Sequence, residues 1–217
     1  MSIANDLRSI KGAIPEDVTL IAVSKTRSIE EIKEAYDAGQ RDMGENRVQE
    51  LCSKVEQLPK DIRWHLIGHL QSNKVKYIAP FVHLIHSIES FKLLKEVDKR
   101  ARENKRVIKV LLQFHIAQEE SKFGFSLEEV LDLIHPIKEL KNIEVNGVMG
   151  MATFTDNEHQ IKSEFRSLKR IYFDLKDHFG DQFNTISMGM SGDYELAIVE
   201  GSTMIRVGSK IFGSRNY

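Results

Sequence analysis

The feature that most constrains this chain is a regular alternation of short apolar, β-branched segments with longer amphipathic ones. Eight of the apolar segments have the length and composition of buried strands, and the first five begin about 22 residues apart. That spacing fits one strand, one helix and two short loops. The predicted strands are 18–24, 41–45, 62–68, 84–87, 107–115, 144–151, 184–188 and 204–212.

Helix signals lie between these segments. Ser28 with Glu31 and Ser126 with Glu129 both fit the capping-box pattern that begins a helix, and each is followed by apolar residues at helical spacing. The clearest helical pattern runs from Ile161 to Phe179, with charged residues on its other faces. The chain therefore alternates strand and helix from end to end.

Strands that are continuously apolar, rather than alternating with polar residues, indicate a parallel sheet covered by helices. Eight strand–helix units in 217 residues match the size of a closed (β/α)8 TIM-type barrel. An open doubly wound sheet is the alternative. Because no Pro/Gly/Ser-rich linker interrupts the pattern, we expect one domain over 1–217.

Composition excludes several classes of protein. The formal net charge is −1, which does not favour a nucleic acid or an anionic membrane. The single cysteine, Cys52, cannot form an intrachain disulfide, so a reducing compartment fits. We find neither a signal-peptide pattern at the start nor an apolar run of membrane-spanning length, and we expect a cytoplasmic protein.

Lys25 follows the first predicted strand directly. Active sites of such barrels lie at the carboxyl ends of the strands, so this amine is expected at the barrel mouth. Partial burial disfavours the ammonium form, and a neutral amine can attack an aldehyde to form an imine. Taken alone, Lys25 is more simply interpreted as a solvated lysine at the start of a loop, and the other strand ends are what favour the imine.

The last two strands carry the signals of a phosphate site. Ser191 lies in the small-residue segment after the seventh strand, just before a helical stretch, where backbone N–H groups can approach an anion. Ser191 or Asp193 could instead simply cap that helix. Gly208 and Ser209, at the end of the eighth strand, could complete the cradle. Arg206 shares a side of that strand with Gly208 and, if buried, needs a partner: a carboxylate or a ring nitrogen of a cofactor.

Polar residues near the ends of other strands could add to the mouth. Asn46 could orient a cofactor ring or cap the next helix. His65 is a further candidate cofactor contact, although a histidine satisfied within the core is a simpler interpretation. His115 ends the fifth predicted strand.

A metal site is not expected. His65 and His69 lie across a strand-to-loop corner, and alternation should face His83 and His86 apart. Neither a Walker-type loop nor a Gly-x-Gly-x-x-Gly motif supports nucleotide binding.

With these residues gathered, the sequence resembles the pyridoxal phosphate homeostasis protein family, whose members are short single-domain relatives of the alanine racemase barrel. The resemblance extends from residue 22 to the C-terminus. It is carried by AVSKT (22–26), GENRVQE (44–50), WHLIGHLQSNK (64–74), ESKFG (120–124), SMGMS (187–191), EGSTMIRVG (200–208) and IFG (211–213).

The resemblance implies pyridoxal 5′-phosphate as the cofactor, held as an imine on Lys25. It implies that Asn46 lies near the cofactor, that Arg206 faces the pyridine nitrogen, and that three residues bind phosphate: Ser191, Gly208 and Ser209. Two positions depart from the family pattern. His115 stands where asparagine is common, which affects the polar lining of the mouth, and Met43 stands where phenylalanine is frequent, which is typical of an exchange within the core.

An arginine beside the pyridine nitrogen cannot easily give up a proton, so it leaves the ring a weak electron sink. The resembling racemases are implied to use a tyrosine from a second domain of a partner subunit, and this chain spends all eight strands on the barrel. We therefore expect a monomeric protein that holds and releases the cofactor for intracellular vitamin B6 homeostasis, without strong catalysis. Enzymes that accept the cofactor are the expected partners. The alternatives are a slow pyridoxal-phosphate racemase or decarboxylase, a cofactor-free Schiff-base lyase, and an interaction module.

Overall fold

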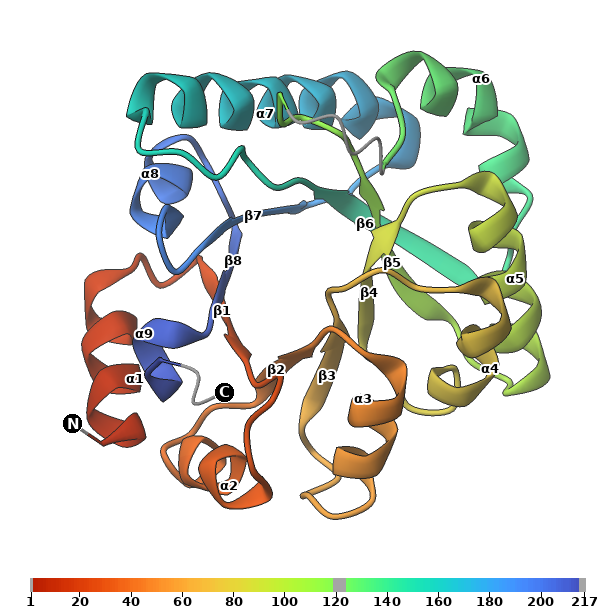
Figure 1. Cartoon of the computed structure of the whole chain (residues 1–217). Coiled ribbons are helices and arrows are strands. Elements are labelled where there is room, and N and C mark those ends of the chain that lie inside the picture. The colour runs from red at the N-terminus through yellow and green to blue at the C-terminus, as the bar shows by residue number, and fades with distance from the viewer. Residues whose placement is uncertain (1, 119–123, 215–217) are drawn as a thin grey trace.

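The strands close into one ring in the computed structural model, which describes residues 2–118 and 124–214. All neighbouring strands are parallel and follow chain order, and β8 pairs with β1 to complete the barrel (Figure 1). The closed barrel is thus confirmed, since the first and last strands pair with each other instead of forming the edges of an open sheet. The strands are β1 (Thr19–Val23), β2 (Asp42–Glu45), β3 (Arg63–Leu66), β4 (Leu84–Ile88), β5 (Ile108–Gln113), β6 (Ile143–Met149), β7 (Thr185–Met190) and β8 (Met204–Val207).

Helices surround the ring of strands, and the N-terminal helix lies beside the last one (Figure 1). Both predicted capping boxes are present, at Ser28 and at Ser126. The helices are α1 (Ile3–Ala13), α2 (Ile29–Asp37), α3 (Val48–Val55), α4 (Val75–Ile78), α5 (Phe91–Glu103), α6 (Leu127–Lys138), α7 (Glu158–Phe179), α8 (Tyr194–Val199) and α9 (Ser209–Phe212), with a 3-10 turn, η1 (Ser72–Lys74), before α4.

The last predicted strand, 204–212, was too long. The structure ends β8 at Val207 and begins the short helix α9 at Ser209. Gly208 turns the chain out of the extended conformation, and its carbonyl accepts hydrogen bonds from the N–H groups of Ile211 and Phe212. The chain therefore bends at the glycine, and a ligand could approach the backbone there. Of the segment ESKFG (120–124), which carries part of the family resemblance, only Gly124 lies within the described residues.

Two apolar clusters divide the core. The larger one fills the space between the strands and the surrounding helices. The smaller one lies inside the barrel and consists of Ile21, Leu84, Leu111, Met149 and Met204. The two clusters are separate because successive side chains of a strand point to opposite faces.

The barrel interior is partly polar. His65, His86, Ser187 and Arg206 are all buried, at 4% exposure or less. Because buried polar groups are costly unless they are hydrogen-bonded, we expect these four side chains to be joined by hydrogen bonds. Within 2–118 and 124–214, no helix is long and apolar enough to cross a membrane.

Candidate functional site

A cavity of about 470 Å³ opens at the carboxyl ends of the strands. It has the size of a typical small-molecule site. Six of the seven residues expected to bind a cofactor line it, although they come from distant parts of the chain. They are Lys25, Asn46, Ser191, Arg206, Gly208 and Ser209.

Lys25 is set into the cavity wall by the residues on either side of it. Ser24 is fully buried, and Thr26 has a positive φ of 64°. A left-handed conformation is costly for a β-branched residue, so the surrounding structure must hold it. The Thr26 N–H donates to the Glu50 carboxylate at 2.5 Å, which fixes the backbone just after Lys25.

A buried lysine connects both sides of this segment. Lys54 Nζ donates to the Ser24 carbonyl at 2.8 Å and forms ion pairs with Glu45 and Glu50 at 2.8 and 2.7 Å. The Ser24 hydroxyl donates to Glu45 at 2.7 Å. Burial raises the pKa of Glu45, and the Lys54 ammonium opposes that rise.

We call Glu45, Glu50 and Lys54 the lysine clamp, and sequence reasoning missed it. The i, i+4 spacing of Glu50 and Lys54 on α3 was a visible signal for one pair. Nothing local indicated that Glu45, on β2, would join them.

The expected phosphate positions meet at the ends of β7 and β8. The Gly208 N–H donates to the Ser191 hydroxyl at 3.1 Å, which joins the two loops directly. A side chain at Gly208 would lie 3.2 Å from the Val23 carbonyl oxygen, so this close approach suits glycine. The segment therefore presents small residues and backbone amides to the cavity.

Asp193 does not cap α8 through its side chain. It occupies the N-cap position without a side-chain hydrogen bond to the helix. Its carboxylate instead accepts from the Met190 N–H at 2.5 Å, and burial raises its pKa. Asp193 thus tightens the turn that contains Ser191, and Ser191 itself bonds to Gly208 instead of capping the helix.

Arg206 is 4% exposed and reaches the cavity from β8. Its guanidinium donates to the Ser187 hydroxyl at 2.6 Å, the Ser187 carbonyl at 2.9 Å and the Gly150 carbonyl at 3.1 Å. Burial lowers its pKa to about 10, so it stays charged at neutral pH. No carboxylate of a described residue bonds to it, and three bonds leave two of its five N–H groups for a ligand.

Asn46 follows β2 and packs against the end of β3. A Cβ at Gly68 would lie 2.5 Å from the Asn46 carbonyl oxygen, so the two backbones touch. Asn46 does not cap α3, because Arg47 holds the N-cap position. Its backbone is therefore fixed by the neighbouring strand end.

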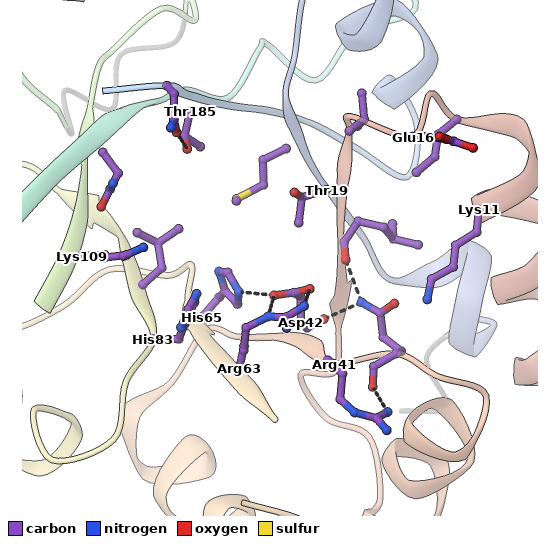
Figure 2. A pocket seen from close by; sticks show the side chains of 18 of the residues that line it. Lys11, Glu16, Thr19, Arg41, Asp42, Arg63, His65, His83, Lys109 and Thr185 are labelled. Carbon is purple, nitrogen blue, oxygen red and sulfur yellow. Dashed lines mark hydrogen bonds and ion pairs between the residues drawn. The ribbon is translucent and has the colours of Figure 1, made fainter. Parts of the chain in front are cut away.

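The expected place of His65 at this mouth was wrong. His65 lines a separate cavity of about 610 Å³ at the amino ends of the strands, where its side chain points toward Asp42 (Figure 2). It lies within β3, two residues after the strand begins, and alternation turns it into the barrel interior. His65 therefore cannot contact a ligand bound beside Lys25.

The expectation that His83 and His86 face apart was also wrong, because both rings lie next to His65. The ring centroids of His83 and His86 lie 5.3 and 5.2 Å from that of His65. His83 precedes β4, so the alternation of that strand does not govern its direction. Among the described residues, no group of three or more His, Cys, Asp or Glu side chains is placed to hold a metal.

The two residues that depart from the family pattern, His115 and Met43, lie in different environments. His115 is exposed and does not line the cavity beside Lys25. Met43 is fully buried in the outer core cluster, as expected for an exchange within the core.

Comparison with known proteins gives consistent matches across the chain. The family model of the alanine racemase N-terminal domain matches residues 1–216. A pyridoxal phosphate homeostasis protein of Aquifex aeolicus is 40% identical over 199 residues, which cover 91% of this chain and 87% of the relative. The Escherichia coli K12 protein of the same name is 36% identical over 211 residues, covering 95% and 89%.

Solved structures agree with these matches. PipY of Synechococcus elongatus, with pyridoxal phosphate bound, is 35% identical with a TM-score of 0.90, over 98% of this chain and 100% of that one. Its form without the cofactor has a TM-score of 0.93 over the same shares at 35% identity. Alanine racemase of Clostridium difficile, at 15% identity and a TM-score of 0.84, covers 100% of this chain and 60% of its own, and supports the fold alone.

Proposed function

This chain belongs to the pyridoxal phosphate homeostasis protein family, within the alanine racemase N-terminal domain family. On that basis we propose that it binds pyridoxal 5′-phosphate as an imine on Lys25. Its role is intracellular homeostasis of this vitamin B6 cofactor. The observation that carries the proposal is the convergence of Lys25 with five other expected residues on one cavity. A relative of the same fold has been solved with this cofactor bound.

The residues present fit the cofactor's three chemical features. Lys25 supplies an amine for the aldehyde. The two N–H groups of Arg206 that bond to none of the described residues suit an unprotonated ring nitrogen, which accepts a hydrogen bond. Ser191, Gly208 and Ser209 would supply hydroxyl and amide donors for the phosphate, and Asn46, which lines the same cavity, would orient the ring.

When bound, pyridoxal phosphate supplies an aldehyde that condenses with an amine and a ring that withdraws electrons. A carboxylate partner would keep the ring nitrogen protonated and strengthen that withdrawal. Arg206 would instead leave the nitrogen unprotonated, because a guanidinium with a pKa of about 10 retains its proton at neutral pH and only donates a hydrogen bond. The site is therefore suited to holding the cofactor more than to forming carbanions.

The remaining parts of the proposal concern the setting of the protein. All strands of the described residues belong to the barrel, so the mouth beside Lys25 is bordered by loops through which the cofactor can enter and leave. We take the chain as one domain over 1–217, acting as a cytoplasmic monomer that exchanges cofactor with enzymes that accept it.

Borohydride reduction followed by intact-mass measurement and peptide mapping tests the proposal. We expect a reduced pyridoxal phosphate adduct on Lys25 and a visible imine absorbance, both lost in Lys25→Ala. Lys33→Ala is the matched control, because Lys33 is an exposed lysine on α2 that pairs with Asp37. An unmodified wild-type protein, or an adduct that survives in Lys25→Ala at the same level, would reject the proposal.

A further inference from the structure

A chain of hydrogen bonds crosses the barrel interior from one cavity to the other. At one end, Arg206 donates to the Ser187 hydroxyl at 2.6 Å, and Ser187 Oγ lies 3.0 Å from His86 Nδ1. His86 Nε2 lies 3.0 Å from His65 Nδ1. At the other end, His65 Nε2 lies 3.1 Å from Asp42 Oδ1 in the cavity at the amino ends of the strands (Figure 2).

The direction of every bond in this chain is fixed from both ends. Arginine can only donate, so the Ser187 oxygen accepts from Arg206 and its single proton is left for His86 Nδ1. An ionised carboxylate can only accept, so His65 Nε2 must donate to Asp42. With both imidazoles neutral, the one remaining arrangement has His86 Nε2–H donating to His65 Nδ1.

Burial and charge favour this protonation state. His65 and His86 are 1% and 0% exposed, and burial lowers the pKa of each imidazole. Burial opposes ionisation of Asp42, but hydrogen bonds from Arg63 at 2.6 and 2.5 Å and from His65 outweigh it and hold its pKa well below the usual range. Both histidines are thus neutral with the proton on Nε2, between a fixed cation and a fixed anion.

We propose that this donor chain positions Arg206 for the cofactor, with Ser187, His86, His65 and Asp42 as positioning residues that never touch it. The inference rests on the proposed function, because Arg206 acts on a ligand only if pyridoxal phosphate occupies the cavity beside Lys25. Every dipole in the chain points the same way, from the Arg206 cation toward the Asp42 anion. Such alignment strengthens each hydrogen bond in a buried site.

The donor chain fixes the orientation of Arg206, a buried arginine that bonds to no carboxylate of residues 2–118 or 124–214. The Ser187 hydroxyl accepts from Arg206 and donates its own proton to His86, so it is held in place from both sides. Rotation of the guanidinium would break its bonds to the Ser187 hydroxyl, the Ser187 carbonyl and the Gly150 carbonyl. Protons do not pass along the hydrogen-bonded chain to the ring, because the Arg206 guanidinium retains its protons at neutral pH. The arginines in the cavity at the Asp42 end are already paired: Arg63 forms an ion pair with Asp42, and Arg41 forms one with Asp61.

The tautomers of the two histidines can be measured without cofactor. We expect the imidazole ¹⁵N shifts of the free protein at pH 7 to show His65 and His86 both neutral with the proton on Nε2. An Nδ1–H tautomer or an imidazolium at either position would overturn the proposal.

Variants at the two ends test the effect on the cofactor. Ser187→Ala removes the hydroxyl between Arg206 and His86, and Asp42→Asn removes the terminal charge. We expect each to weaken cofactor binding on the order of fivefold, about the effect of one hydrogen bond, and to shift the pH midpoint of the imine absorbance.

Each variant has a matched control. Ser202→Ala removes a buried hydroxyl that is not part of the donor chain. Its partners are the carbonyls of Ile186, Met188 and Met204. Asp61→Asn removes a carboxylate that pairs with Arg41. Both controls should keep the wild-type affinity and pH midpoint.

The outcomes separate this inference from the proposed function. A wild-type protein without imine absorbance would reject the function itself. The donor chain alone would be rejected if the wild-type protein shows the imine but Ser187→Ala and Asp42→Asn match their controls in affinity and pH midpoint.

Discussion

Replacing Lys54 by methionine should destabilise the protein strongly, because Lys54 neutralises a carboxylate that water cannot reach. The side chains of Lys54 and Glu45 are 6% and 0% exposed. Methionine keeps most of the apolar volume and removes the charge. Breaking a buried ion pair from one side costs about 3–5 kcal/mol, since the other charge is left uncompensated.

The lower part of that range is expected here. The Ser24 hydroxyl still donates to Glu45 in the variant, while Glu45 Oε2 already lacks a partner among the described residues. A loss of about 3 kcal/mol in a chain of this size lowers the melting temperature by roughly 6–12 °C. Urea unfolding and thermal unfolding of the cofactor-free protein measure the two quantities.

The loss should depend on pH in a defined direction. Burial raises the pKa of Glu45 in the folded protein, and removing the Lys54 ammonium raises it further. A carboxyl whose pKa is raised by folding costs stability as pH rises and stops doing so once it is protonated. The difference between wild type and Lys54→Met should therefore shrink as pH falls from 8 toward 5.

Two controls separate the buried charge from a general effect of losing a lysine. Lys33→Met breaks an exposed pair with Asp37 and should cost about 0.5 kcal/mol or less. Lys54→Met combined with Glu45→Gln should recover much of the loss. Equal losses for Lys54→Met and Lys33→Met, or a difference that does not change between pH 8 and pH 5, would refute the reasoning.

Two further predictions follow from the geometry of the cavities. Gly68→Ala places a methyl group 2.5 Å from the Asn46 carbonyl oxygen, so it should displace Asn46 and weaken cofactor binding. Gly12→Ala is the control, because no atom lies within 4 Å of the added methyl group, and it should keep the wild-type affinity. Equal affinities of the two variants would contradict the predicted role of the Gly68–Asn46 contact. Burial lowers the pKa of His83 to about 4, so its NMR titration should show a neutral imidazole from pH 8 to pH 5.5. Because unfolded histidine binds a proton near pH 6.5, His83 should cost stability as pH falls from 7 toward 4, and a midpoint near 6.5 would show this account to be wrong.

Much of the architecture was predictable because its signals are local. The alternation of strands and helices, the capping boxes at Ser28 and Ser126, and the helix ending at Phe179 all depend on residues within one or two turns of each other. The barrel rule then placed Lys25 and Ser191 at one mouth, since parallel strands all end on the same side. No distance between side chains was needed for these conclusions.

The register between neighbouring strands decided what the sequence could not. Whether His65 faces a cofactor or the opposite cavity depends on where it falls within β3, and its contact with His86 depends on the pairing of β3 with β4. The lysine clamp and the donor chain likewise join residues that are far apart in sequence. Hydrophobic patterning determined which segments lie inside this protein, but only the closed barrel brought their polar groups within hydrogen-bonding distance, because closure fixes the stagger of every strand against the next.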